Sequence, residues 1–179
     1  MDPFDPELES PIGRLRLVID PQGRVLRLWF PQANGDVAPA RTLAVPGRAL
    51  AGIADRLRRY FAGELDAIDD IAIAPQGSPL QSAVWSAVRQ VPAGQVTSYG
   101  ALASRLGHAD RRMARSIGMA NAANPVAILI PCHRVVGKDG SLRGYAWGLE
   151  RKRWLLAHER ARIGPARAVA AGDAAGFRA

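Results

Sequence analysis

Residues 124–137, which read NPVAILIPCHRVVG, carry five consecutive apolar residues between two prolines and continue directly into a Cys-His pair. A short apolar run bounded by turn residues predicts a buried strand over Val126–Ile130, and Pro131 prevents that strand from pairing further. Cys132 is therefore expected at the end of a strand, immediately before His133.

Cys132 is the only cysteine among the 179 residues. Intramolecular disulfides, cysteine-based zinc sites and iron–sulfur clusters need several cysteines, so this sequence excludes them. A thiol beside a histidine and positive charge is expected to have a lowered pKa, and its thiolate is a nucleophile. A lone cysteine is also commonly a small buried hydrophobe. The Cys-His pair alone leaves both interpretations open.

The net charge of +8 is distributed unevenly along the chain. Residues 1–75 carry nine Arg and eleven acidic residues, whereas residues 76–179 carry fifteen Lys or Arg and five acidic residues. A positive field on one part of a protein is typical of a polyanion partner, most commonly nucleic acid. An Arg-rich solvated surface has the same composition, so charge alone does not decide between them.

The first part of the chain predicts a small α/β domain over residues 1–75. Alternating apolar residues at Leu15–Ile19 and Leu26–Phe30 predict a β-hairpin. Apolar residues at helical spacing from Leu50 to Phe61 predict a helix that Gly63 can end. This part has no motif for phosphate, metal or acyl chemistry, so we expect it to act as a scaffold.

The second part, residues 76–163, predicts a mainly helical domain. Ser78, Pro79 and Gln81 form a capped helix start. Two further helical patterns, about 98–106 and 110–120, flank a short Gly turn with Asp110 as the second N-cap. Such a pair is typical of a helix-turn-helix, whose second helix lies in a DNA groove.

The last predicted helix spans about residues 148–162 and directs Leu149, Leu155 and Leu156 into the core. Residues 164–179 are rich in Ala and Gly without a period, so we expect a disordered tail. No apolar run reaches the length of about 18 residues that a membrane span needs, and the first residues are acidic where a signal peptide is basic. A cytoplasmic protein without membrane contact is expected.

Several sequence segments on both sides of the cysteine occur together, in a consistent order and spacing. With them, the chain from about Leu80 to Arg160 resembles the O6-alkylguanine-DNA alkyltransferase family, in its stand-alone bacterial type. The resemblance covers nearly half of the chain without a break. Its segments are Gly94–Gly100, Ala114–Gly118, Asn124–Pro125, Pro131–Gly137, Gly144–Tyr145 and Arg153–Glu159.

The resemblance implies a DNA repair protein, a methylated-DNA–protein-cysteine S-methyltransferase. It would move an alkyl group from O6 of guanine, and less efficiently from O4 of thymine, onto its own Cys132. Because water does not reverse a thioether, each molecule would act once. The implied partner is double-stranded DNA carrying alkylated bases, contacted through its minor groove by a monomer. No cofactor and no metal are implied.

The fold that the resemblance implies is α/β. A ribonuclease H-like N-terminal domain would be followed by a mainly helical domain of winged-helix or helix-turn-helix type.

The resemblance also assigns catalytic roles by matching positions. His133 would take the proton from Cys132 through a water molecule, and Glu159 would orient that histidine. Tyr99 would donate a hydrogen bond toward the guanine ring, and Asn124 would brace the turn that links the recognition helix to the active site.

Since the target atom is inaccessible in a stacked duplex, the damaged nucleotide would be flipped out, and Arg115 would fill its place. Met113 stands where the family often has Ala and could act as a wedge. Trp147 stands where many members have Gly, so we expect a narrowed pocket that accepts methyl adducts well and benzyl adducts poorly. The predicted pocket residues are Val135, Tyr145, Ala146 and Trp147, and the predicted DNA-contacting residues are Ser98, Arg111, Met113, Ala114, Arg115 and Gly118.

Three other functions are weighed against this one. A lesion-marking DNA-binding protein without transfer would not need Cys132. A helix-turn-helix transcription factor would need a dimerisation segment, which we do not find. A Cys-His hydrolase would turn over many times and would leave the basic half unexplained.

Overall fold

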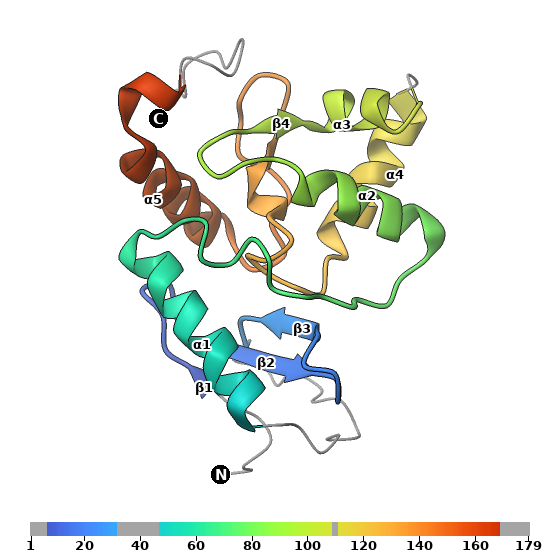
Figure 1. Ribbon diagram of the computed structural model, residues 1–179. Helices are drawn as coiled ribbons and strands as arrows, with labels where there is room; N and C mark the ends of the chain where they lie inside the picture. Colours follow the sequence, from blue (N-terminus) through green and yellow to red (C-terminus); the bar gives the residue numbers. More distant parts are fainter. Residues whose placement is uncertain (1–6, 32–46, 109–110, 169–179) are drawn as a thin grey trace. The chain divides into compact units, whose positions relative to one another are not determined.

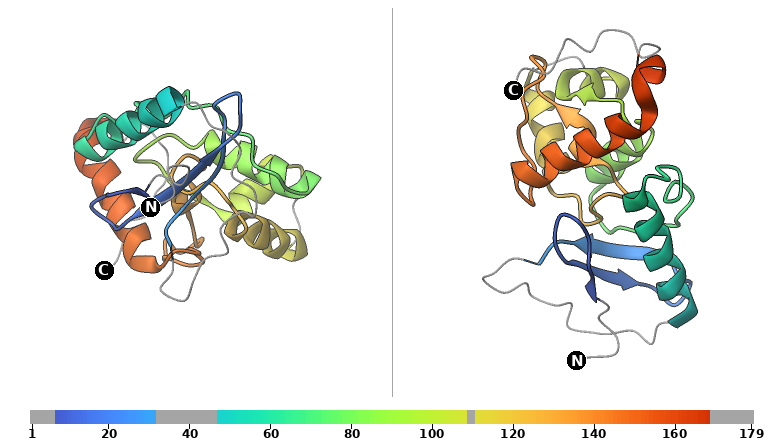
Figure 2. Two further views of the ribbon diagram at one scale, coloured as in Figure 1. Left: turned by 90° about the horizontal axis from the view of Figure 1, so that it is seen from below. Right: turned by 90° about the vertical axis from the view of Figure 1, so that its left-hand side faces the viewer.

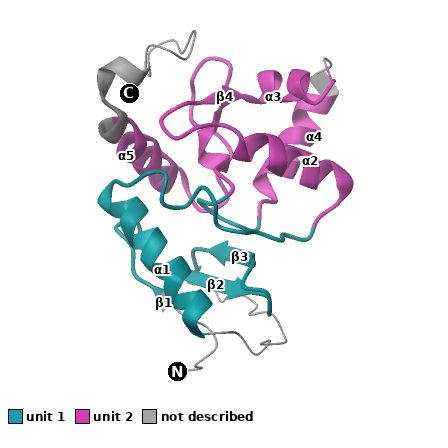
Figure 3. Cartoon of the chain, viewed as in Figure 1, with its two compact units in different colours: residues 1–76, 125–129 teal, residues 77–124, 130–179 magenta. Residues whose placement is uncertain are grey.

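Residues 7–31, 47–108 and 111–168 are described by the computed structural model of the protein (Figure 1). The chain divides into two units, residues 1–76 with 125–129 and residues 77–124 with 130–179 (Figure 3). The five residues 125–129, which we expected in the second domain, belong to the first unit. The chain thus returns to the first unit for one loop before it reaches the cysteine.

Three antiparallel strands form the sheet of the first unit, in the order β1 (Glu7–Leu8), β2 (Leu15–Ile19) and β3 (Val25–Trp29). The predicted hairpin is confirmed, because β2 and β3 pair. The alternation expected in β3 is wrong at Leu26, which is half-buried, whereas Val25 is buried. The pairing slips at this point, with Ile19 opposite Val25, and such a bulge turns one residue away from the core.

Helix α1 (Gly47–Ala62) confirms the helix predicted in this region. Its buried residues Ile53, Leu57 and Tyr60 follow helical spacing on one side. Gly63 ends the helix at a φ of 111°, which only glycine adopts readily. Figures 1 and 2 show α1 lying along the β1–β3 sheet, so its apolar side and the sheet together enclose the core of this unit.

In the second unit, helix α2 (Pro79–Arg89) begins with the predicted capping box. The Ser78 hydroxyl accepts from the Gln81 backbone N–H at 3.3 Å, and the Gln81 side chain accepts from the Ser78 N–H at 2.7 Å. Trp85 is buried, as expected, and its indole donates to the carbonyl of Ala120 at 2.9 Å. This bond ties α2 to the later helix that contains Ala120.

That later helix is α4 (Arg111–Ala122), and α3 (Tyr99–Arg105) precedes and packs against it. Both confirm the predicted helix pair. The turn between them contains Gly107 at a φ of 79°. The predicted N-cap Asp110 lies outside the described residues.

The strand expected over Val126–Ile130 is wrong, although these residues are buried as predicted. They form consecutive turns, and Ile128 has a φ of 69°, which an extended strand does not allow. Only the start of the run bridges to β3, where Ala127 donates to the Leu28 carbonyl at 2.6 Å. The prolines on both sides and the reversal at Ile128 end the extended backbone after one bridge.

A short 3-10 turn, η1 (Cys132–Arg134), leads into β5 (Val135–Val136), which pairs in parallel with β4 (Thr97–Ser98). The last helix is α5 (Leu149–Ala168). None of the described helices has both the length and the apolar character that crossing a membrane requires.

Two expectations about α5 need correction. Leu149 is 41% exposed and not part of the core, whereas Leu155 and Leu156 are buried. The helix also continues to Ala168, so the tail expected to be disordered from residue 164 is helical over its first five residues. Residues 169–179 lie outside the described part of the chain. The architecture is mixed α/β with a sheet unit followed by a mainly helical unit, as predicted.

Candidate active site

Cys132 starts the η1 turn with its side chain buried, at 3% exposure. Its Sγ accepts a hydrogen bond from Nδ2 of Asn124 at 3.1 Å. The same Nδ2 donates to the Ile130 carbonyl at 2.8 Å. Asn124 lies two residues after the end of α4, so one amide connects the chain leaving this helix, the turn before the cysteine and the sulfur atom.

Burial raises the pKa of the Cys132 thiol to about 11, although the Asn124 hydrogen bond and the positive charge of Lys152 act in the opposite direction. The lowered thiol pKa expected from the sequence is therefore wrong for this structure. The basic neighbours can be read from the sequence, but the enclosure of the sulfur cannot, and here it has the larger effect. At neutral pH the group is a thiol, and its reaction needs a base.

His133 and Glu159 form a fully buried pair, with His133 Nε2 2.9 Å from Glu159 Oε1. Burial would raise the pKa of Glu159, but His133 and Arg134 outweigh it and hold the pKa well below its usual range. The nitrogen that faces an ionised carboxylate carries the hydrogen, so Nε2 is the donor.

The other ring nitrogen, Nδ1 of His133, is therefore the unprotonated one in the neutral ring. It is buried and has no hydrogen-bond partner among the residues that the structure describes. Burial lowers the pKa of His133, while Glu159 raises it in part. The geometry thus provides a neutral imidazole whose basic nitrogen is available.

Arg134 completes this charged cluster, and sequence reasoning gave it no role. Its Nε and Nη2 donate to the two Glu159 oxygens at 3.0 and 2.8 Å, and its Nη1 donates to the Val91 carbonyl at 2.6 Å. The backbone N–H of Gly94 also donates to Glu159, at 3.1 Å. A carboxylate that is buried beside a neutral histidine needs a permanent cation nearby, and this requirement could have pointed to Arg134.

Lys152 is the second functional residue that the sequence analysis missed. It is fully buried, and its ammonium donates to the carbonyls of Val135 at 2.7 Å and Arg143 at 2.6 Å. Burial lowers its pKa to about 8, and the negative charge of Cys132 opposes this shift. Lys152 lies seven residues before Glu159, on the same side of α5, and this spacing was a usable signal.

Tyr145 lies between His133 and Trp147, and all three belong to the predicted site. The Tyr145 ring meets His133 edge-on at 6.5 Å between centroids and meets Trp147 at 5.3 Å. Tyr145 is buried and Trp147 is half-buried. Of the two other predicted pocket residues, Val135 is buried and Ala146 is exposed. The indole therefore packs on a ring that in turn meets the ring of His133.

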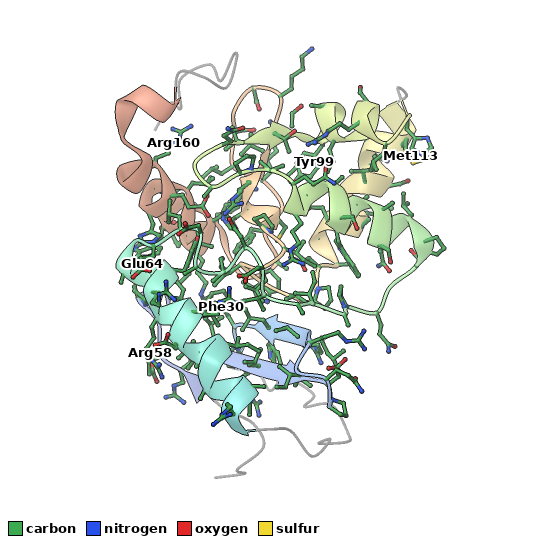
Figure 4. The ribbon with its side chains drawn as sticks, in the orientation of Figure 1. Phe30, Arg58, Glu64, Tyr99, Met113 and Arg160 are labelled. Atoms are coloured by element: carbon green, nitrogen blue, oxygen red, sulfur yellow. The ribbon has the colours of Figure 1, made fainter. Side chains whose placement is uncertain are left out.

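Tyr99 is the first residue of α3, and its hydroxyl is 3.4 Å from the Arg143 carbonyl (Figure 4). Burial raises its pKa, and so does Cys132 in its thiolate form. Two glycines face its side chain, and only at Gly144 would a Cβ be tight against it. A Cβ on Gly118 would lie 3.7 Å from the ring, and a Cβ on Gly144 would lie 3.1 Å from the hydroxyl.

The predicted DNA-contacting residues are distributed unevenly over α3 and α4. Arg115 is exposed, whereas Met113 (labelled in Figure 4) and Ala114 are half-buried. The Ser98 hydroxyl accepts from the Ala101 N–H as the N-cap of α3. The side chain of Arg111 lies outside the described residues, and Gly118 faces Tyr99.

Met119 is 63% exposed and stands four residues after Arg115 on α4. Residues four apart lie on the same side of a helix. Met119 is therefore more exposed at the surface of this helix than Met113. The sequence analysis did not single out Met119.

Within the described residues, no three His, Cys, Asp or Glu side chains come together as a metal site would require. The site consists of one thiol, a histidine–carboxylate pair, two buried cations and two tyrosines. This arrangement can deprotonate a thiol and can donate hydrogen bonds to a planar ligand.

Known proteins with similar sequences share one description. The model of the family described as 6-O-methylguanine DNA methyltransferase, DNA binding domain, matches residues 79–161. The methylated-DNA–protein-cysteine methyltransferase of Shigella flexneri is 50% identical over 164 residues, which cover 87% of this chain and 95% of that protein. The protein of the same name from Mycolicibacterium paratuberculosis is 44% identical over 155 residues, covering 86% and 90%.

Solved structures agree with these relatives. OGT of Mycobacterium tuberculosis, determined in complex with DNA, is 36% identical, covers 88% of this chain and 93% of its own, and matches with a TM-score of 0.77. O6-methylguanine-DNA methyltransferase of Pyrococcus kodakaraensis, at 22% identity and a TM-score of 0.55, has the same fold.

Proposed function

The chain belongs to the methylated-DNA–protein-cysteine methyltransferase family, and we propose that it repairs DNA by flipping out an O6-alkylated guanine and transferring the alkyl group to Cys132. Members of the family repair DNA by alkyl transfer to a cysteine, and this chain has one cysteine. The observation that carries the proposal is the position of that cysteine, directly before a fully buried His133–Glu159 pair.

The proposed reaction is a displacement at the alkyl carbon. His133 Nδ1 takes the thiol proton through a water molecule as the sulfur forms its bond to carbon and the carbon–O6 bond breaks. The Glu159 carboxylate stabilises the imidazolium that results. Tyr99 donates to the guanine as it accumulates negative charge, and the proton that His133 took from the thiol passes through water to the departing guanine, so that His133 ends neutral. Because burial raises the pKa of the thiol to about 11, the thiol needs a base, and we assign this role to His133.

DNA is the partner of this family domain, and we assign its contact surface here to the exposed side of α4. Arg115 fills the gap left by the extruded nucleotide. Met119, on the same side of the helix, contacts the minor groove as an apolar wedge, a use of methionine typical of minor-groove proteins. We propose that the protein acts as a monomer in the cytoplasm.

The size of the adduct is limited by Trp147. Its indole packs against Tyr145, whose ring in turn meets His133, so the space beside the thiol is narrow on this side. Methyl groups on guanine are therefore the preferred substrate, with O4-alkylthymine repaired less efficiently and benzyl-sized groups poorly.

Mass spectrometry of the protein mixed with a duplex carrying one O6-methylguanine tests this function. We expect a gain of one methyl group per protein, confined to the peptide that contains Cys132, and no gain in Cys132→Ala. Tight binding of the duplex without a mass change would favour the lesion-marking alternative. Repeated turnover without a modified peptide would favour a hydrolase.

A further inference from the structure

Asn121 is fully buried in the last turn of α4, and its two side-chain polar atoms have no hydrogen bond of ordinary geometry with any described residue, although the carboxamide interacts with the Tyr99 hydroxyl. A carboxamide carries two donor hydrogens and an acceptor oxygen. Buried polar groups are nearly always satisfied, and one that is not requires a physical reason. The proposed function gives Asn121 no role.

The surroundings of Asn121 are those of the active site. Gly118, one turn earlier, faces the ring of Tyr99, and Asn124, one turn later, donates to the sulfur of Cys132. Asn121 shares a side of α4 with Gly118, three residues earlier, and precedes Asn124, which lies just beyond the end of the helix, so it stands between these two contacts along the chain. Its carboxamide is close enough to the Tyr99 hydroxyl to offset part of the effect of burial on the pKa of that group.

The Tyr99 hydroxyl is itself only weakly engaged. It lies 3.4 Å from the Arg143 carbonyl, longer than the 2.7–2.8 Å typical of an O–H···O bond. A phenol has one hydrogen to donate and can also accept. A donor that occupies its acceptor side leaves the hydrogen for another group and polarises it further.

We infer that Asn121 is a positioning residue for Tyr99, with its Nδ2 donating to the phenolic oxygen so that the hydroxyl hydrogen is directed to the base in the pocket. This inference rests on the proposed function, because the base is the one that the protein repairs. Asn121 thus strengthens the hydrogen bond that Tyr99 gives to guanine as its alkyl group leaves.

The test combines Asn121→Leu with Tyr99→Phe in a double-mutant cycle. Leucine has a similar volume and no polar atom, so replacing an unsatisfied group should leave the melting temperature unchanged or higher. We expect Asn121→Leu to slow single-turnover methyl transfer from duplex DNA about tenfold in the wild-type chain. In the Tyr99→Phe background the same substitution should change the rate less than about twofold.

An equal loss in both backgrounds, or no loss in either, would overturn the inference. If Asn121→Leu does not fold, Asn121→Ala replaces it in the same cycle.

A spectroscopic titration separates this inference from the proposed function. Ultraviolet titration of the protein, with Tyr99→Phe subtracted, reports the pKa of Tyr99, and Asn121→Leu should raise that pKa. This measurement needs no methyl transfer. A wild-type protein that fails to transfer methyl groups would refute the proposed function, whereas an unchanged Tyr99 pKa would refute the role of Asn121.

Discussion

The two units of the molecule use charge in different ways. In the first unit, each ion pair among the described residues keeps at least one partner half exposed or more, including the pair of the buried Asp20 with Arg24, and in Arg14–Glu9 and Arg59–Glu64 both partners are. In the second unit, Glu159 binds His133 and Arg134 with every side chain at 5% exposure or less. Exposed pairs contribute little to stability, whereas buried charges are costly unless fully paired. The first unit, which we expect to act only as a scaffold, does not need a buried cluster of charges. The second unit, which contains the thiol, has such a cluster.

The comparison predicts that the effect of a substitution follows the burial of the side chain and its distance from the thiol. Glu159 and Lys152 are fully buried, Trp147 is half-buried, and Met119 is exposed. The expected effects decrease in this order.

The largest effect is expected for Glu159→Gln. The substitution removes the charge that compensates Arg134 and fixes the donor nitrogen of His133, so the free energy of unfolding should fall by about 3–5 kcal/mol. Methyl transfer should slow about 100-fold or more, since His133 loses the carboxylate that stabilises its protonated form. Urea unfolding and single-turnover transfer measure the two effects.

Glu64→Gln in the first unit is the matched control, because it removes the same charge from an exposed pair. We expect no measurable change in unfolding or transfer. Equal losses for the two variants would contradict the distinction between the units.

The second prediction concerns Lys152→Met. Losing the ammonium leaves the carbonyls of Val135 and Arg143 without this donor, so the variant should be less stable by about 1–3 kcal/mol at pH 7. Transfer should also slow, because the Lys152 bonds hold the segment that leads to Tyr145.

The pH dependence of Lys152→Met has a defined sign. In the folded protein the pKa of Lys152 is about 8, below the value of about 10.5 for an exposed lysine. Between these values the unfolded chain binds more protons, so this group makes wild-type stability rise with pH. The stability of wild type relative to the variant should therefore increase from pH 8 to 10.5. A constant difference, measured by urea unfolding across this range, would show that folding does not lower the pKa of Lys152.

Sequence reasoning found the β2–β3 hairpin and the helices, and singled out Cys132, because their signals are local. The capping box at Ser78, the helical spacing of α1 and the run around Cys132 each depend on neighbours in the chain. The turns at Val126–Ile130 were missed because an apolar run indicates burial but not backbone direction.

Arg134 and Lys152 were missed for a different reason. Their importance comes from partners distant in the chain, since Arg134 binds Glu159 across 25 residues and Lys152 binds Val135 across 17. The raised pKa of Cys132 has the same origin, because enclosure by several elements is not visible in any one segment.

The third prediction addresses the half-buried Trp147. Trp147→Gly removes the indole that packs on Tyr145, so reaction with O6-benzylguanine should accelerate about tenfold or more. Reaction with O6-methylguanine in a duplex should change less than about threefold, because the thiol and its base are unaffected. Rates with both substrates for both proteins give the ratio. Equal acceleration for both substrates would mean that Trp147 limits access in general and not adduct size.

The smallest effect is expected at the exposed Met119. Met119→Ala removes the proposed wedge without touching the thiol, so affinity for duplex DNA should fall about threefold to tenfold, while alkylation by free O6-methylguanine base stays unchanged. Leu149→Ala is the control, because Leu149 is also an exposed apolar residue of this unit, at 41%, but lies on α5. Fluorescence anisotropy with a labelled duplex at fixed salt measures the affinities. If both variants lose affinity equally, general surface hydrophobicity accounts for the effect. If only Met119→Ala does, the exposed side of α4 is the part of the second unit that contacts DNA.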